Sequence, residues 1–319
     1  MIAERTRCRW QEDLLGLLPQ RAARALLGLP LGVAAGIIEL HMGCDRPLLA
    51  VDRSRDYCLT PTGAVTYNPA EGLYLTEEEC AHLVDRFTMY SEYAFEDALR
   101  CGFLTLRGGY RVGLAGKAVL QAGLVSGYSA YRSFCVRIPH AVPGVAEPVY
   151  GRLRGGNAVQ NTLVVSPPGM GKTTLLRDMA RLLASDRPGQ PALRVCVVDE
   201  RSELAGGAGP DRFDVGWKTD VLEGFPKAQG MMLALRSLNP QVLVTDEIGT
   251  PEDGEALREA VNCGVAVVAS AHGASIGDLR LRPTLRELLR DNLFRLFVVL
   301  DGKQGVGVIS AVQEGGDRL

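Results

Sequence analysis

Val164-Val-Ser-Pro-Pro-Gly-Met-Gly-Lys-Thr-Thr174 is the most informative segment of this 319-residue chain. It reads as an apolar strand, a Gly/Pro turn and an amphipathic helix that begins at Lys-Thr-Thr. This is the construction of a phosphate-binding P-loop. Gly169 and Gly171 allow the backbone to turn its N–H groups toward anionic oxygens, and the start of the helix adds a partial positive charge. The stretch therefore predicts a nucleotide site.

The side chains after the turn have separate expected roles. Lys172 is expected to reach the β- and γ-phosphates, and the hydroxyl of Thr173 to ligate Mg²⁺. Thr174 is expected to support the loop or to contact an α-phosphate. The predicted ATP-binding residues are Pro168, Gly169, Met170, Gly171, Lys172, Thr173 and Thr174.

One position departs from the motif. Ser166 stands where the motif begins with Gly, and Ser is small enough to fit but has a narrower backbone repertoire. Its effect on the loop geometry stays open. The alternative interpretation, a chance Gly-rich turn, is disfavoured because strand, loop and helix all fall where the motif requires them.

The composition limits the classes of protein to which this chain can belong. The apolar fraction is 46%, the charged fraction 23% and the net charge −2, which is typical of a soluble globular protein and gives no reason to expect stable nucleic-acid binding. The eight cysteines and four histidines are scattered without metal-binding spacing, so we expect reduced thiols in a cytoplasmic protein. No signal peptide or membrane span is evident.

Three segments are predicted. Residues 1–40 look helical, either as a cap on the next domain or as a docking element for a partner. Residues 41–150 mix short strands with helices, as expected of a small α+β domain. The predicted elements up to 150 are strands over 36–41 and 48–52, helices from Thr76 and over 93–102, a hairpin over 103–106 and 110–114, and a strand over 133–138. Residues 151–319 alternate strands and helices regularly, which predicts an α/β domain with a buried parallel sheet, closed by a hairpin whose last strand covers 305–312.

Polar side chains follow three further apolar strands of that domain. Asp246 is expected to hold Mg²⁺, and Glu247 to orient or deprotonate the attacking water unless it merely pairs with a Lys or Arg. Glu200 is a second candidate for positioning water, with Asp199 supporting the metal shell. His272 would sense the γ-phosphate or link the site to a neighbouring subunit; a structural histidine is the alternative. Because ligands bind at the carboxyl ends of such strands, these groups predict one catalytic site.

Phosphoryl transfer also calls for an arginine, often supplied by a neighbouring subunit. The sequence does not rank the candidates, which are Arg111, Arg137, Arg201, Arg236 and Arg258.

Several motifs together resemble one family. They are Pro167-Pro-Gly-Met-Gly-Lys-Thr-Thr-Leu-Leu-Arg-Asp178, Val198-Asp-Glu-Arg-Ser-Glu-Leu-Ala205, Asp220-Val-Leu222, Pro226-Lys-Ala-Gln-Gly-Met-Met232, Val244-Thr-Asp-Glu-Ile-Gly249, Ser270-Ala-His-Gly273 and Gly108-Gly-Tyr-Arg-Val-Gly-Leu-Ala-Gly-Lys117. Over about 90–315 the chain resembles the stage III sporulation protein AA family, which is itself similar to the traffic ATPases of type II and type IV secretion. By that resemblance, Asp199-Glu200 match the Asp box, Asp246-Glu247 the Walker B box and Ala271-His272-Gly273 the His box.

The resemblance implies a function and partners. It implies an ATPase, working as a homohexameric ring, at the base of a channel between mother cell and forespore. The partners would be membrane proteins of that channel, and the location would be the cytoplasm or the inner face of the mother-cell membrane.

The sequence thus predicts a Mg²⁺-dependent ATPase with a RecA-like P-loop domain and a smaller N-terminal α+β domain. Two alternatives stay open: an ATP-binding scaffold that only assembles the channel, and a RecA-like motor that acts on DNA. A small-molecule kinase is less favoured, because no lid or second substrate pocket is legible.

Overall fold

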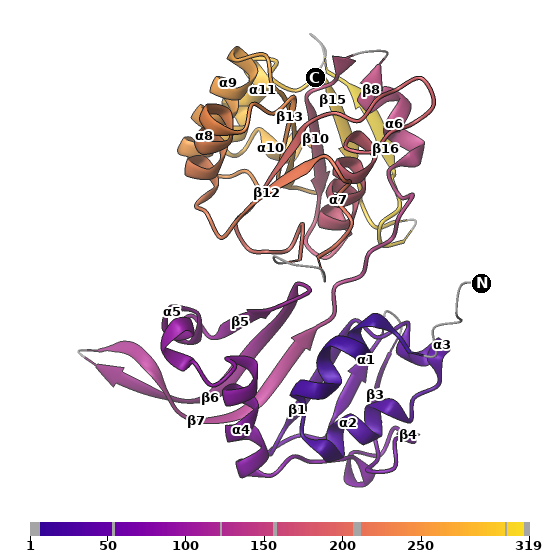
Figure 1. The fold of residues 1–319 in the computed structure, drawn as a ribbon, viewed down its shortest axis with the longest axis vertical. Coiled ribbons are helices and arrows are strands. Elements are labelled where there is room, and N and C mark those ends of the chain that lie inside the picture. Colours follow the sequence, from indigo (N-terminus) through magenta and orange to yellow (C-terminus); the bar gives the residue numbers. More distant parts are fainter. Residues whose placement is uncertain are drawn as a thin grey trace. The chain divides into compact units, whose positions relative to one another are not determined.

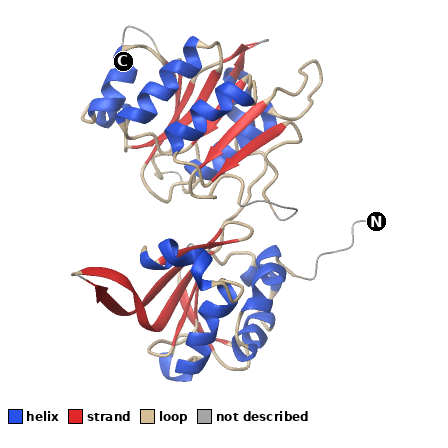
Figure 2. Cartoon of the chain, turned by 60° about the vertical axis from the view of Figure 1, so that its left-hand side comes forward, coloured by secondary structure: helices blue, strands red, loops and turns tan. Residues whose placement is uncertain are grey.

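The computed structural model describes residues 7–52, 55–121, 123–155, 158–206, 212–303 and 305–315. The chain divides into two compact units, Met1–His140 and Ala141–Leu319 (Figure 1). Each unit has a seven-stranded sheet with helices packed against it (Figure 2). Over the described part of the chain, every helix falls short of the length and hydropathy that a bilayer crossing requires.

The first unit is built on a sheet whose pairings are all antiparallel, in the order β4-β3-β2-β1-β7-β6-β5. Its strands are β1 (Glu39–Gly43), β2 (Leu49–Val51), β3 (Asp56–Leu59), β4 (Val65–Thr66), β5 (Phe103–Leu106), β6 (Tyr110–Gln121) and β7 (Leu124–Arg137). Alternation along the central strands decides which face is covered. Leu40 and Met42 of β1 are buried in the core with Val136 of β7, whereas Glu39 and His41 are only half-buried.

The helices of this unit are α1 (Arg9–Leu14), η1 (Leu15–Leu17), α2 (Gln20–Leu27), α3 (Leu31–Ala34), η2 (Pro69–Glu71), α4 (Glu77–Phe87), η3 (Glu92–Phe95) and α5 (Glu96–Arg100). Each of these α-helices places side chains in that core, whereas η2 is exposed. Thr76 caps α4, as its sequence predicts, through a reciprocal capping box with Glu79. Residues 1–40 were expected to be helical, either as a cap on the next domain or as a docking element. Trp10, Leu14 and Leu26 share one core with the sheet, as a cap would, because each buries an apolar side chain against it.

The strands β6 and β7 are longer than the sequence indicates. Only 110–114 and 133–138 were predicted, whereas the ribbon runs over 110–121 and 124–137 and extends past the helices of this unit (Figure 1). From Ala115 to Gln121 the side chains are exposed. Three register irregularities interrupt this part of the ribbon. No inside–outside alternation marks the segment in the sequence, so the pattern gave no signal there.

The second unit has a mostly parallel sheet in the order β12-β11-β13-β14-β10-β15-β16, with β16 antiparallel at one edge. Its strands are β10 (Thr162–Ser166), β11 (Val195–Asp199), β12 (Thr219–Glu223), β13 (Val242–Thr245), β14 (Ala266–His272), β15 (Leu296–Val299) and β16 (Ala311–Glu314), and β8 (Arg154–Gly155) and β9 (Ala158–Val159) form a separate ribbon. The predicted buried parallel strands are present, and β12 was not predicted.

Helices cover both faces of this sheet (Figure 1). They are α6 (Glu147–Leu153), α7 (Lys172–Leu183), α8 (Lys227–Ser237), α9 (Pro251–Asn262), α10 (Ile276–Leu279) and α11 (Pro283–Arg290). Leu163 and Val165 of β10 belong to the core that α8, α9 and α11 cover, and Val164 to the core that α6 and α7 cover. A strand buried on both faces needs an uninterrupted apolar run, which is why the run before the P-loop is so clear.

Two boundaries differ from the expectation. The second unit begins at Ala141 rather than near 151, because α6 places Val149 and Leu153 in its core. The closing strand lies at Ala311–Glu314 rather than over 305–312. Gly305 and Gly307 have φ of 119° and 80°, which an extended strand does not accommodate.

Candidate active site

The P-loop joins the end of β10 to the start of α7. Gly169 and Gly171 have φ of 75° and 92°, the left-handed region in which glycine is favoured, so the two glycines serve the turn as predicted. Ser166 is fully buried at the end of β10, and its hydroxyl donates to the carbonyl of Pro167 over 2.9 Å. Serine therefore fits the first position of the loop, because its polar group is satisfied within the loop itself.

The remaining P-loop residues surround the start of α7. Pro168 and Gly169 are exposed, whereas Met170, Gly171, Thr173 and Thr174 are half-buried. The turn is therefore open to solvent at Pro168 and Gly169. The individual phosphate and metal contacts expected of these residues stay predictions.

The strands that carry the other predicted groups are neighbours in the sheet. Their order, β11-β13-β14-β10, places the ends of all four at one edge. In the register, Ser166 lies directly opposite His272. The parallel sheet thus brings Ser166, at the start of the P-loop, next to His272, although the two are far apart in the sequence.

One chain of polar contacts links the P-loop to two of these groups, His272 and Glu247, and to Arg201. Lys172 Nζ lies 3.0 Å from His272 Nδ1, and His272 Nε2 lies 2.8 Å from Glu247 Oε1. Arg201 contacts the other carboxylate oxygen of Glu247 over 3.1 Å. Because an ammonium group only donates, Nδ1 of His272 accepts and Nε2 carries the proton given to Glu247.

Lys227 forms a second group with the acids. Its Nζ lies 3.7 Å from both Asp246 Oδ1 and Glu200 Oε2, and it donates to the carbonyl of Glu247 over 2.9 Å. Lys227 lies within one of the family motifs, but no role was predicted for it. Its position in the first turn of α8, directly after Pro226, is the feature of the sequence that could have marked it as a site residue.

Burial perturbs the titration of three groups. Asp246 is 4% exposed, and burial raises its pKa to about 6 although the ammonium of Lys227 opposes the shift. Burial lowers the pKa of Lys172, against the carboxylates of Glu247, Asp246 and Glu203. Burial also raises the pKa of Asp199, against backbone N–H donors in the following loop. Strongly shifted groups that cluster at strand ends are typical of functional sites.

Asp199 and Glu200 diverge in their surroundings. The carboxylate of Asp199 accepts from the N–H groups of Glu203 and Ala205 over 2.8 and 2.7 Å, so it shapes the loop after β11. Glu200 is partly exposed and reaches the site through Lys227. Glu203, which the sequence did not single out, lies near enough to influence the pKa values of both Lys172 and Asp246.

The oxygen groups available for a divalent ion are the hydroxyl of Thr173 and the carboxylate of Asp246. Both are hard donors of the kind that Mg²⁺ prefers. Asp246 has one nearby cation, Lys227 at 3.7 Å, and no closer ion pair among the described residues. This donor chemistry fits the predicted metal.

A segment from the end of the chain supports the P-loop. The N–H of Gly307 donates to the carbonyl of Met170 over 3.1 Å. A Cβ added at Gly302 would meet the sulfur of Met170 at 2.6 Å, and one at Gly171 would meet the Cα of Gly307 at 3.0 Å. The sequence pattern predicted a strand over 305–312. The closely spaced glycines at 302, 305 and 307 could instead have indicated that this backbone passes close to another part of the chain.

Comparisons with known proteins identify the family. The model of the family described as sporulation stage III, protein AA matches residues 9–319. The chain belongs to this family. It is 37% identical over 303 residues to Stage III sporulation protein AA of Bacillus subtilis (strain 168), a match over 95% of this chain and 94% of that protein. SEEDLING PLASTID DEVELOPMENT 1 of Arabidopsis thaliana is 32% identical over 155 residues, or 48% of this chain and 22% of that protein.

Solved structures show the same fold at low identity. The ATPase DotB of Legionella pneumophila has a TM-score of 0.54 at 18% identity, over 84% of this chain and 73% of that one. The pilus retraction motor PilT, solved with bound ADP, has a TM-score of 0.52 at 15% identity, over 83% of this chain and 74% of that one. This member of the sporulation stage III protein AA family therefore has the fold of these ATPases.

In this family member the five candidate arginines have different surroundings. Arg201 contacts Glu247, Arg137 contacts Glu39 over 3.3 Å and Arg258 pairs with Glu287 and Asp291. Arg111 lies 4.1 Å from the ring of Phe103. Of the five, Arg201 alone reaches the acids at the strand ends within the described chain.

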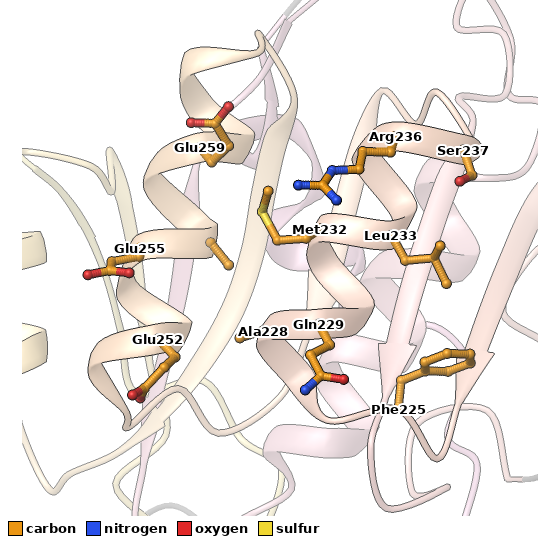
Figure 3. Close-up of a pocket in the computed structure, with 11 residues that line it drawn as sticks. Phe225, Ala228, Gln229, Met232, Leu233, Arg236, Ser237, Glu252, Glu255 and Glu259 are labelled. Atoms are coloured by element: carbon orange, nitrogen blue, oxygen red, sulfur yellow. The ribbon is translucent and has the colours of Figure 1, made fainter.

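Arg236 belongs to a separate groove between α8 and α9 (Figure 3). Met232, Leu233 and Phe225 supply apolar surface there, and glutamates on α9 form one rim. None of the predicted ATP-binding residues lines this groove, so it is not part of the nucleotide site.

Proposed function

We propose that this chain is a Mg²⁺-dependent ATPase of the secretion-motor type. The observation that carries the proposal is the contact chain from Lys172 through His272 to Glu247, because it joins a phosphate-binding cation to a carboxylate that can act on water. The sheet order, with β10 between β14 and β15, supports the RecA-like assignment.

The proposed reaction is hydrolysis of the γ-phosphoanhydride. Water forms the new bond to γ-phosphorus, the bond to the β,γ-bridging oxygen breaks, and ADP and phosphate leave. Glu247 orients the water and accepts its proton, which passes to the phosphate product. Bound Mg²⁺, held by Thr173 and Asp246, would neutralise negative charge on the phosphates.

The remaining residues position these groups. Lys172 exchanges its contact with His272 for one with the γ-phosphate. Because His272 also contacts Glu247, the loss of the lysine contact changes the hydrogen bonding of Glu247. Lys227 holds the backbone of Glu247 and balances the charge of Asp246. Arg201 occupies the second oxygen of Glu247 until the substrate is bound, so its release would activate the base.

The test compares ATP binding with ATP turnover in the full chain. Lys172→Ala is expected to lose both. Glu247→Gln is expected to retain binding and to lower turnover by about 10²-fold or more, because it removes only the base. Thr60→Ala, in the first unit, is the control. Wild-type turnover in Lys172→Ala would contradict the site assignment.

By relation to the sporulation family, we propose a homohexamer that energises a channel between mother cell and forespore through membrane partners. Mass measurement with and without ATP tests the ring, and sporulation of cells carrying Glu247→Gln separates motor from scaffold. Normal sporulation with Glu247→Gln would favour the scaffold. Stimulation of turnover by DNA, falling steeply with salt, would favour a motor on DNA.

A further inference from the structure

Three potential metal ligands meet on the first sheet, in the unit that does not contain the P-loop. Glu39 and His41 lie two residues apart on β1, so their side chains share one face of the sheet. Cys135 lies opposite His41 in the register between β1 and β7. Among the described residues, no other group of three such side chains brings its ligand atoms this close together.

The distances suit a single small ion. His41 Nε2 lies 2.9 Å from Glu39 Oε2, Cys135 Sγ lies 3.6 Å from His41 Nε2, and Cys135 Sγ lies 3.8 Å from Glu39 Oε2. A tetrahedral zinc site with bonds of about 2.0–2.3 Å separates neighbouring ligand atoms by about 3.3–3.8 Å. The two distances from Cys135 Sγ already match this range. The distance between His41 Nε2 and Glu39 Oε2 needs to increase only slightly.

The surroundings fit an open site. His41, Glu39 and Cys135 are all half-buried, which leaves solvent access for a fourth ligand. Arg137 contacts Glu39 through Oε1, at 3.3 Å, so Oε2 remains directed at the other two ligands. The guanidinium group of Arg137 opposes a cation. A thiolate and a carboxylate together supply two negative charges, which a divalent ion balances.

The geometry points to a Zn²⁺ site formed by Glu39, His41 and Cys135, with water as the fourth ligand. Sulfur, imidazole and carboxylate are the donors that zinc accepts, whereas Mg²⁺ and Ca²⁺ are poor partners for sulfur. Binding replaces the thiol proton and the proton shared by His41 and Glu39. The ion would join β1 to β7 beside the end of the first unit and stabilise that unit.

Cobalt substitution in the nucleotide-free full chain, kept reduced with a phosphine, tests the site. Co²⁺ is expected to give a thiolate-to-cobalt charge-transfer band and visible bands of tetrahedral intensity, and Zn²⁺ is expected to abolish both. Cys135→Ser is expected to lose the thiolate band and to weaken Co²⁺ binding by about tenfold or more. His41→Ala and the milder Glu39→Gln are expected to weaken binding by a similar factor.

Two matched variants control for other donors. Cys44→Ser removes a thiol that shares the carbonyl of Arg132 with Cys80, and His82→Ala removes a histidine near Glu78 and Asp85. Both are expected to keep the full signal. A thiolate band that survives Cys135→Ser, or no band in the wild type, would show that the cluster is only a hydrogen-bonded ion pair. Circular dichroism of each variant verifies folding.

Discussion

Glu247 has a partner at every polar group. Its N–H donates to Ser270 over 3.0 Å, its carbonyl accepts from Lys227, and its carboxylate contacts His272 and Arg201. Its φ of 35° is positive, which costs a non-glycine residue on the order of 1 kcal/mol or more. Strain held in place by this many contacts is typical of a residue whose position matters for chemistry.

Asp246 is expected to reduce the stability of the metal-free protein. Its folded pKa of about 6 exceeds that of an unfolded aspartate, so the folded state binds the extra proton and loses stability as pH rises from about 4 to 6. Above about pH 6 this loss of stability has reached its full value. Asp246→Asn is therefore expected to raise the free energy of unfolding at pH 7–8 by up to about 3 kcal/mol, and by little near pH 4.

Urea unfolding with a chelator present measures this difference across pH. Asp253→Asn provides the matched control, because its buried carboxylate accepts from the N–H groups of Gly249 and Thr250. That variant is expected to lose about 1 kcal/mol as a capping bond weakens. A lower free energy of unfolding for Asp246→Asn than for the wild type at pH 8 would contradict the inference that the buried, ionised Asp246 destabilises the metal-free protein.

At the scale of elements, the P-loop depends on the glycine-containing segment before β16. Gly302 has φ of 74°, and an added Cβ would meet Met170 Sδ at 2.6 Å. Gly302→Ala is therefore expected to displace Met170 and to weaken ATP binding several-fold. Gly307→Ala is the control, because its φ of 80° carries similar strain while its Cβ would meet nothing within 4 Å.

Calorimetric titration with a slowly hydrolysed ATP analogue measures both variants. Combining Gly302→Ala with Met170→Ala is expected to restore part of the affinity, since the shorter side chain removes the clash. Equal losses in the two single variants would mean that backbone strain, not contact with the P-loop, is responsible.

The elements that the sequence predicted well are those with a repeating signal. β10, β11, β13 and β14 each contain an apolar run. The polar residues at the ends of these runs were expected to converge, and Lys172, His272 and Glu247 do contact one another in series. β12 was missed because its burial is partial, with Asp220 exposed. The cluster at Cys135 was missed because its partners lie 94 and 96 positions away, a separation that only strand pairing reveals.

At the scale of the whole molecule, the two units have separate cores and should respond separately to their ligands. A ligand that binds only the folded state of one unit stabilises that unit by mass action. Calorimetry of the full chain is expected to show two transitions. ATP with Mg²⁺ should raise one of them, and Zn²⁺ the other.

Two variants assign the transitions. Lys172→Ala should abolish the shift caused by ATP and leave the shift caused by Zn²⁺, whereas Cys135→Ser should do the reverse. A single transition that both ligands raise together would show that the units unfold cooperatively, against the separation of their cores.

The carboxylate of Asp178 gives α7 a second attachment. It accepts from the N–H groups of Gly144 and Ala146 over 2.9 and 2.8 Å, at the very beginning of the second unit. The same helix starts at Lys172, so these two bonds attach the backbone at Gly144 and Ala146 to α7 about two turns from the P-loop. Under the proposed function, a rotation of α7 on nucleotide binding would be passed through Asp178 to the segment that enters the second unit.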